Sequence, residues 1–294
     1  MITYVRNSIF ESNAQVLVNT VNTVGVMGKG LAYEFKKLYP DMFKNYQKFC
    51  DSNQFQIGQL YLYKTEHKWV LNFPTKENWR KPSELEYIEL GLQKFVDNFE
   101  LKGIKSIAFP MLGCGNGGLE WSDVKPVMEK YLKKLPIDIY IHIYEKDKYE
   151  PEHASPKEVQ KWLHQAPELI SFNEFNQELI DLCGLVCSIK VEDIEIEATY
   201  QDECFILKSK HNDVILSKDD LANIWHTLQM NGYINANMVS SELSKNFKEI
   251  GTFLSKLEYI TLSQTGDIEQ ENLSLRLLAY KKTTQSNSKV NQVA

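Results

Sequence analysis

The sequence lacks the features of membrane-spanning, exported and disulfide-bonded proteins. Its five cysteines are an odd number without a CxxC pair, which argues against a disulfide framework or a zinc ribbon. No apolar run approaches the roughly 20 residues needed to cross a bilayer, and residues 1–6 are not an export signal. The six histidines show no metal-ligand spacing. We therefore expect a cytoplasmic protein with no metal, no cofactor and no membrane partner.

The net charge of −6 is small, but it is distributed unevenly along the 294 residues. Residues 1–150 contain 20 Lys and Arg against 18 Asp and Glu, whereas residues 151–294 contain 13 against 21. An acidic second half would repel a polyanion and is not expected to be a conventional phosphate-binding module. The nearly neutral first half can still bind phosphates locally. The length suits about two domains.

Residues 1–150 alternate between strand and helix patterns, as α/β proteins do. Short apolar or alternating stretches predict strands at residues 16–21, 59–63, 69–73, 106–111 and 137–144. Helices are predicted at residues 31–38, where Pro40 ends the helix, from Ser83 as N-cap to Gly103, and at residues 122–132. We expect a mixed sheet sandwiched by helices.

A smaller, acidic α+β domain is predicted at residues 155–282, after a break marked by the helix start Ser155-Pro156. Helices are expected at residues 157–166, 173–183, 218–230 and within 239–257, and strands near 191–199, 204–208 and 259–262. The order of the last elements resembles a winged-helix module, although DNA-binding examples are usually basic. The polar tail, residues 283–294, is predicted to be flexible.

Two glycine-rich loops each follow a buried strand and precede a helix. The loop at residues 22–30 fits neither the GxxxxGK[ST] nor the GxGxxG spacing. The loop at residues 112–119 has four glycines in six residues, a cluster that indicates positive φ angles or close approach to a ligand. Loops at the carboxyl ends of strands form the crevice where α/β proteins bind ligands. A nucleotide-like diphosphate ligand is therefore expected, with a purely structural turn as the alternative.

Two short motifs, one at each glycine loop, resemble those of the macrodomains, the ADP-ribose-binding fold. Residues 18–22, with the sequence VNTVN, lead into the first loop, and Gly113-Cys114-Gly115 opens the second. Within that fold, residues 19–30, 72–76 and 79–80 resemble the DarG antitoxins, partners of the DNA-modifying toxin DarT. The likeness covers about residues 1–145. It implies an antitoxin enzyme, a DNA ADP-ribosyl glycohydrolase, that removes ADP-ribose from thymine in single-stranded DNA and binds a DarT-like toxin through its C-terminal domain.

The resemblance implies that Lys76 is catalytic, because it matches the lysine that this family uses. Cleavage at C1 of a ribose passes through a cation-like sugar, and the departing base leaves as an anion or is protonated. An ammonium group could protonate the leaving base, whereas a free amine could attack C1 or the opened aldehyde to give a Schiff base. The sequence favours neither route. Without the resemblance, a solvated surface lysine is the ordinary interpretation.

The resemblance also assigns binding residues to the two loops and to the start of the chain. Asn22 is expected to hold ribose hydroxyls, with a turn cap as the alternative. Ser8 stands where the family usually has an aspartate for adenine, and the second loop has Asn116 and Gly117 where some related hydrolases have an aspartate. The predicted ADP-ribose-binding residues are Ser8, Ile9, Thr20, Val21, Asn22, Gly28, Gly30, Leu31, Gly113, Cys114, Gly115, Asn116 and Gly117. Contacts to the substrate base or DNA are predicted for Asn78, Trp79 and Arg80.

Other interpretations stay open at this point. The first half could bind ADP-ribose without hydrolysis, or it could hydrolyse ADP-ribosylated protein or an ADP-ribose ester. Cys114 could be a small packing residue. In the second half, acids could imitate DNA phosphates in the toxin's groove, whereas a solvated face is the ordinary reason for surplus acids. The candidate acids are Glu192, Asp193, Glu195, Glu197, Asp202, Glu203, Asp219 and Asp220.

Overall fold

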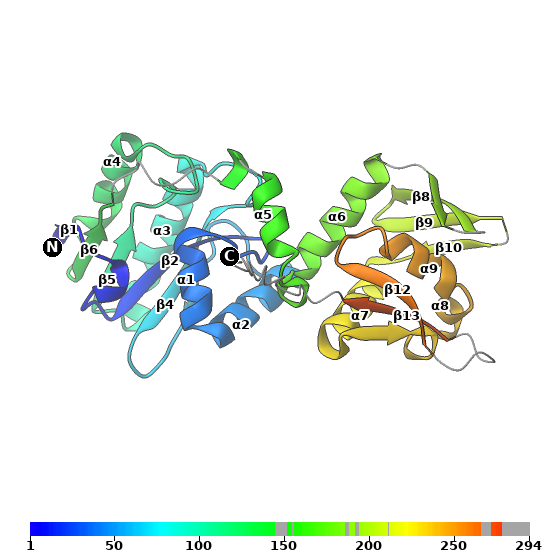
Figure 1. Cartoon of the computed structure of the whole chain (residues 1–294). Coiled ribbons are helices and arrows are strands. Elements are labelled where there is room, and N and C mark those ends of the chain that lie inside the picture. The colour runs from blue at the N-terminus through cyan, green and yellow to red at the C-terminus, as the bar shows by residue number, and fades with distance from the viewer. Residues whose placement is uncertain are drawn as a thin grey trace, which may run out of the picture. The chain divides into compact units, whose positions relative to one another are not determined.

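The chain forms two compact units in a computed structural model (Figure 1). The structure describes residues 1–144, 152–154, 156–185, 188–191, 194–210, 212–265 and 272–277. The first unit comprises Met1–Leu163 and Ile170–Leu185, and the second comprises His164–Leu169 and Val186–Ala294. The predicted tail at residues 283–294 and most of the predicted break at residues 147–156 lie outside the described residues.

The first unit contains a six-stranded mixed sheet. In spatial order its strands are β1 (Ile2–Val5), β6 (Asp138–His142), β5 (Ser106–Pro110), β2 (Val16–Asn22), β4 (Trp69–Lys76) and β3 (Tyr61–Tyr63). Strand β3 runs antiparallel to β4, and all other pairs are parallel. The mixed sheet is as predicted. The sequence analysis missed β1, an edge strand with no fully buried residue and therefore without an apolar pattern.

The described residues of the first unit also form six α-helices: α1 (Gly30–Leu38), α2 (Pro40–Asp51), α3 (Leu85–Lys102), α4 (Trp121–Leu132), α5 (Pro156–Leu163) and α6 (Phe172–Leu185). Helices α3 and α4 bury one face of the sheet, where Phe95 meets Phe109 edge-on at 5.5 Å. Pro40 ends α1 as predicted, but it also begins α2, because proline is tolerated in the first turn of a helix.

The ends of α3 illustrate one correct and one wrong prediction. Gly103 ends the helix in the left-handed conformation with φ of 75°, a geometry that glycine adopts at no steric cost. Ser83 was predicted to cap the other end, but the cap position is Glu84 and it makes no side-chain hydrogen bond. Ser83 instead donates its backbone N–H to the carbonyl of Gly117, at 2.9 Å. The second glycine loop thus takes the residue that the capping pattern had assigned to the helix.

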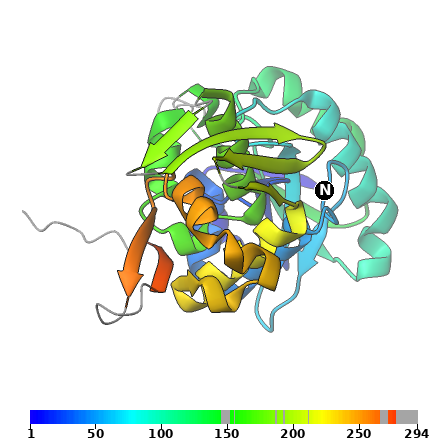
Figure 2. The same cartoon turned by 90° about the vertical axis from the view of Figure 1, so that its right-hand side faces the viewer.

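The second unit contains two antiparallel sheets. One has the order β10 (Asp213–Leu216), β9 (Cys204–Ser209), β8 (Ile194–Gln201), β7 (Ser188–Val191), and the other β11 (Tyr233–Asn235), β13 (Asn272–Leu277), β12 (Ile260–Thr265). Its helices are α7 (Lys218–Asn231), α8 (Ser241–Lys245) and α9 (Phe247–Leu254). Helix α9, orange in Figure 2, packs against strands of both sheets. Phe253 on α9 lies 5.6 Å from Phe205 on β9, which places this helix in the core.

Two predictions for the second domain, residues 155–282, differ from the structure. Residues 191–199 were predicted as one strand, but they span the end of β7 and most of β8, because the alternation of residue types continues through both strands of the hairpin. Helices α5 and α6 were assigned to the second domain, whereas their contacts place them in the first unit. The order α7, β11, α8, α9, β12, β13 is compatible with the winged-helix resemblance, which stays a prediction.

Candidate functional site

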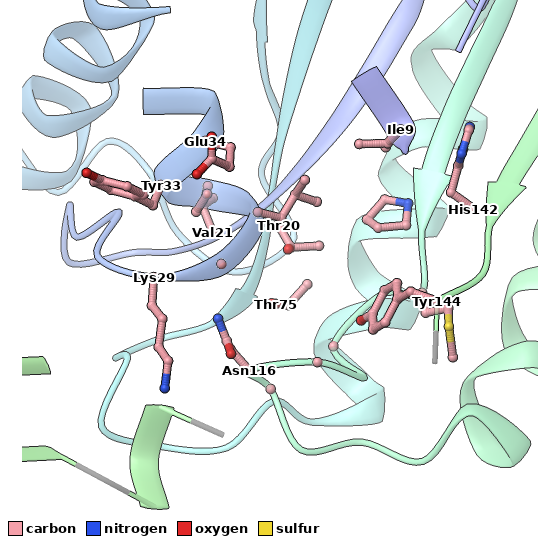
Figure 3. Close-up of a pocket in the computed structure, with 18 of the residues that line it drawn as sticks. Ile9, Thr20, Val21, Lys29, Tyr33, Glu34, Thr75, Asn116, His142 and Tyr144 are labelled. Carbon is pink, nitrogen blue, oxygen red and sulfur yellow. The ribbon is translucent and has the colours of Figure 1, made fainter. Parts of the chain in front are cut away.

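A cavity of about 1330 Å³ lies at the carboxyl ends of the parallel strands of the first unit. Figure 3 shows Thr20, Val21 and Thr75 between side chains of α1 on one side and the end of β6 on the other. The strands end together because they are parallel, so the loops that follow them meet at one edge. The cavity therefore lies at the edge that the sequence predicted.

The first glycine loop is held in place by Asn22, the last residue of β2. The Asn22 Oδ1 atom accepts hydrogen bonds from the backbone N–H groups of Val24 and Val26, both at 3.2 Å, and Nδ2 donates to the Val26 carbonyl at 2.7 Å. Tyr46 from α2 donates to the Asn22 carbonyl at 2.7 Å. This geometry favours the turn-holding role of Asn22. Contact with a ribose stays a prediction.

The N-terminus of α1 opens onto the cavity without a capping side chain. Lys29 occupies the cap position and makes no side-chain cap hydrogen bond, and the first turn contains no acid. Such an N-terminus presents backbone N–H groups and a partial positive charge, which suits a phosphate. Gly30 has φ of 59°, and a Cβ there would lie 2.5 Å from Asn116 Nδ2. Glycine at this position lets the second loop approach the first.

The second glycine loop depends on close contacts within itself. Leu119 donates its backbone N–H to the Gly113 carbonyl at 2.9 Å, and Gly113 has φ of 69°. A Cβ on Gly117 would lie 2.3 Å from the same carbonyl oxygen and 2.3 Å from Ser83 Oγ, which no side chain could tolerate without a shift of the backbone. The glycine cluster is thus required by the fold of the loop, and it also keeps the cavity wall free of side chains.

Lys76 is buried at the end of β4, with 5% of its surface exposed. Its Nζ donates a hydrogen bond of 2.6 Å to the carbonyl of Asn116. A register shift after Val21 pairs Asn22 with Lys76, so the loop-holding amide and the lysine lie on neighbouring strands. The interpretation of Lys76 as a solvated surface lysine is wrong for this fold.

The side of the cavity near the start of the chain contains a histidine, His142, to which the sequence had assigned no binding role. His142 is buried on β6, and its Nδ1 lies 3.0 Å from the carbonyl of Asn7. Its Nε2 has no hydrogen-bond partner among the described residues. Ser8, predicted near adenine, uses its Oγ to accept the Phe10 N–H at 3.3 Å. A buried ring nitrogen without a partner is available to a polar ligand.

Most of the predicted binding residues line the cavity, and several residues that line it were not predicted. The predicted residues that line it are Ser8, Ile9, Thr20, Val21, Asn22, Gly30, Leu31, Lys76, Gly113, Gly115, Asn116 and Gly117. Lining residues that sequence reasoning missed include Lys29, Tyr33, Glu34, Thr75, His142 and Tyr144. Lys29 lies between Gly28 and Gly30 of the first glycine loop, which could have signalled it. For the others, only position near a strand end or a helix start could have done so.

Five predicted residues do not line the cavity: Gly28, Cys114, Asn78, Trp79 and Arg80. Cys114 is buried, and its Sγ lies 3.4 Å from the Leu112 carbonyl, as expected of a small packing residue. Trp79 is fully buried, and its Nε1 donates to Glu174 at 3.0 Å. Arg80 donates two hydrogen bonds to the same carboxylate. These contacts give Trp79 and Arg80 a place in the protein interior, and contact with DNA stays a prediction for them.

Electrostatics near Lys76 and Glu174 follow from burial. Burial lowers the pKa of His153 below its ordinary value, and the charge of Lys76 acts in the same direction. Burial also raises the pKa of the Glu174 carboxyl, while the hydrogen bonds and positive charge of Arg80 oppose that rise. Within the described part of the chain, no group of three or more His, Cys, Asp or Glu side chains could hold a metal ion, and no helix could span a membrane.

Comparison with known proteins places this site in a family. Residues 18–128 match the Macro domain model. The first unit therefore contains a macrodomain over residues 18–128. The chain is 42% identical over 147 residues to a DNA ADP-ribosyl glycohydrolase of Thermus aquaticus. This match covers 48% of the chain and 41% of the relative. A DNA ADP-ribosyl transferase-DNA ADP-ribosyl glycohydrolase fusion protein of Thermosipho africanus is 41% identical over 172 residues, covering 52% of this chain and 44% of the relative.

A solved structure extends the comparison. The macrodomain of Mycobacterium tuberculosis DarG is 42% identical, and the match covers 49% of this chain and 99% of that one with a TM-score of 0.48. The family match and the sequence identities of 41–42% confirm the resemblance that the motifs indicated. The chain spans less than half the length of the curated relatives named above.

Proposed function

We propose that this chain hydrolyses the N-glycosidic bond between ADP-ribose and thymine in single-stranded DNA. The main support is a buried lysine, Lys76, which lines a cavity bordered by two glycine loops. Burying a lysine is costly, so a lysine in such a place is a candidate for function. The names of the relatives that are 41–42% identical supply the DNA substrate. A substrate of this kind favours action in the cytoplasm.

In this proposal the cavity binds the ADP-ribose group through the main chain. The N-terminus of α1 and the N–H groups of the second loop would hold the diphosphate, since neither carries an acid that would repel it. The adenine would lie toward Ile9 and His142, and the distal ribose toward Asn116 and Lys76. This orientation would bring C1 of the distal ribose to the lysine amine.

Lys76 can then act by either of two routes. As an ammonium group it would give a proton to the departing base nitrogen while water adds to C1, and the proton lost by that water would return to the amine. As a free amine it would attack C1 as the C1–N bond to the base breaks, and the base would leave with the proton that the amine loses. Opening of the ribose ring at its C1–O bond would then give a Schiff base, which water hydrolyses. Borohydride would trap the protein on the sugar by the second route only. The Asn116 carbonyl at 2.6 Å would aim the amine in both routes.

The test compares release of ADP-ribose from DarT-modified single-stranded DNA and from ADP-ribosylated protein. Lys76→Ala is expected to slow release from DNA by at least about 100-fold while ADP-ribose still binds, because the general acid or nucleophile is lost. Lys81→Ala is the matched control, since Lys81 is largely exposed on the segment that follows β4. Equal release by Lys76→Ala and wild type would remove Lys76 from the mechanism.

The same assay separates the alternatives. Binding of ADP-ribose without release from either substrate would indicate a binding module. Release from modified protein but not from DNA would indicate a protein ADP-ribosyl hydrolase. Release from DNA alone is the outcome that supports the proposal.

We further propose that the second unit binds a DarT-like toxin through its acidic surface. The Thermosipho relative carries a transferase and a glycohydrolase in one chain, which supports such a partner. Glu195 and Glu197 are exposed on β8, and Asp202 and Glu203 form the exposed turn between β8 and β9. Asp220 is less suited, because it caps α7 together with Ser217. Glu192 and Asp193 lie outside the described residues.

The full-length protein tests this partner. The triple change Glu195→Lys, Glu197→Lys and Asp202→Lys is expected to weaken toxin binding by at least about tenfold at low salt, because three favourable charges are reversed. Glu66→Lys, a single reversal on an exposed loop of the first unit, serves as the control. Toxin binding that is unchanged by the triple reversal would contradict the acidic-surface proposal.

A further inference from the structure

Helix α6 lies outside residues 18–128, which match the macrodomain model. The start of α6 nevertheless forms hydrogen bonds to the segment after Lys76 and to the first glycine loop. Glu174 is the central residue. Its side chain is 1% exposed, and it accepts hydrogen bonds from Trp79 Nε1 at 3.0 Å and from Arg80 Nη1 and Nη2 at 2.7 and 2.6 Å. The Arg80 guanidinium also stacks 4.2 Å from the Trp79 ring centroid. A buried carboxylate with three donors fixes its partners in one arrangement.

The partners of Glu174 belong to the segment that directly follows Lys76. Only two residues, Glu77 and Asn78, separate Lys76 from Trp79, and the side chain of Trp79 is completely buried. The direction in which β4 ends, and hence the direction of Lys76, depends on where this segment is anchored. Within the segment, Asn78 Oδ1 accepts the Arg80 N–H at 3.0 Å, which stiffens the turn.

Ser171, the residue directly before α6, holds the first glycine loop. Ser171 Oγ donates to the Val24 carbonyl at 2.5 Å, and Glu174 donates its N–H to Ser171 Oγ at 3.2 Å. Gly25 has φ of 83°, and a Cβ there would lie 2.9 Å from Ser171 Cβ. Glycine at position 25 therefore leaves space for Ser171, directly before α6, rather than for a ligand. Thr23, in the same loop, donates its N–H to the Glu77 carbonyl at 3.1 Å.

We propose that Glu174 is a positioning residue for the reaction at Lys76, acting through Trp79 and Arg80. This inference rests on the proposed function. Through Glu174 and Ser171, α6 connects the segment after Lys76 with the first glycine loop, so the amine and the loop keep a fixed distance from each other. A misplacement of about 1 Å in a reacting group can cost about 100-fold in rate, which makes such an anchor effective although it never touches the substrate.

The test uses Glu174→Ala and Glu174→Gln in the full-length chain. Glutamine keeps one acceptor oxygen but removes the charge and replaces the other oxygen with a donor that cannot accept from Arg80. We expect kcat to fall by about tenfold in Glu174→Gln and about 100-fold in Glu174→Ala, with KM and ADP-ribose affinity within about threefold of wild type. Gln177→Ala is the control, because this α6 side chain bonds only to Asp181 in the described structure.

A second readout does not depend on activity. Acetylation of Lys76 by an amine-reactive ester, followed by peptide mass spectrometry, is expected to be at least about fivefold faster in Glu174→Ala than in wild type, because the released segment opens more often. An unchanged labelling rate in both Glu174 variants would overturn the positioning role. Equal loss of kcat and ADP-ribose binding would also overturn it, since that indicates general unfolding.

The two proposals fail in different ways. If wild type releases ADP-ribose from neither substrate, the proposed function fails, and the labelling of Lys76 still decides the role of Glu174. If wild type is active and both Glu174 variants match it, only the positioning role fails. Circular dichroism tests whether each variant is folded. If Glu174→Ala does not fold, Glu174→Gln alone tests the positioning role.

Discussion

The two units of this chain are built from different kinds of sheet, and this difference decides where a ligand site forms. In the first unit, parallel strands end at one edge, and the loops that follow them surround a cavity of about 1330 Å³. In the second, antiparallel strands reverse direction at each turn, and a hollow lined by residues such as Asn235 and Phe247 measures only about 200 Å³. Parallel topology gathers loops at one edge, whereas hairpins distribute them over two.

The comparison predicts that the core of the second unit can be weakened without loss of the cavity. Trp225 on α7 is fully buried and packs edge-on against Tyr259 at 6.1 Å. Trp225→Ala is expected to destabilise the second unit by about 3–5 kcal/mol through the cavity it leaves. ADP-ribose binding by the first unit should stay within about twofold.

Calorimetry and titration of ADP-ribose check this prediction together. Met230→Ala, at an exposed position of the same helix, should change neither measurement. Loss of ADP-ribose binding in Trp225→Ala would show that the two units do not fold separately.

The next largest effect is expected in the second glycine loop of the first unit. Gly117→Ala would place a Cβ 2.3 Å from the Gly113 carbonyl oxygen. The loop must move, and ADP-ribose affinity should fall by about 10- to 100-fold in isothermal titration. Gly103→Ala is the control, because a Cβ there meets nothing within 4 Å. That variant should lose about 1 kcal/mol of stability but keep its affinity. Equal affinities in the two variants would contradict the packing argument.

A smaller loss is expected when the support of the first loop is removed. Asn22→Ala deletes the hydrogen bonds to Val24 and Val26, leaving buried backbone groups without partners. Affinity for ADP-ribose should fall by about tenfold, because the loop is no longer held in the binding conformation. Asn98→Ala, on an exposed part of α3, is the control. An Asn22→Ala variant with wild-type affinity would show that the loop holds its shape without this amide.

The smallest effect is a stabilisation that sharpens the boundary between the units. Gly184 lies in α6, and a Cβ there would meet nothing within 4 Å. Gly184→Ala should raise the free energy of unfolding by about 0.5–1 kcal/mol, because alanine loses less backbone entropy in a helix. The gain should appear in the unfolding transition that ADP-ribose also shifts. A gain in the other transition would assign α6 to the second unit.

Much of the first unit could be predicted because its signals are local. The apolar residues of β2 and β5 marked buried strands, and Gly103 marked the end of α3. The pairing of Asn22 with Lys76, by contrast, depends on the strand order and on a register shift after Val21, which no local pattern indicated. The identity of Lys76 as a candidate, however, came from the family resemblance rather than from its surroundings in the sequence.

Other features depended on residues far apart in the chain. Trp79 and Arg80 had the composition of a nucleotide-stacking pair, but Glu174, more than ninety residues later, draws them into the interior. His142 lay in an alternating pattern, and only the fold shows that its ring is buried, with Nδ1 3.0 Å from the carbonyl of Asn7. The sequence by itself determined the strands, the glycine turns and the edge of the sheet where they meet, because backbone preferences and burial periodicity act over a few residues. Only the tertiary structure decided which polar side chains face the cavity and which are hydrogen-bonded inside the protein. The physical reason is that each buried polar group must find a partner, and that partner can come from any part of the chain.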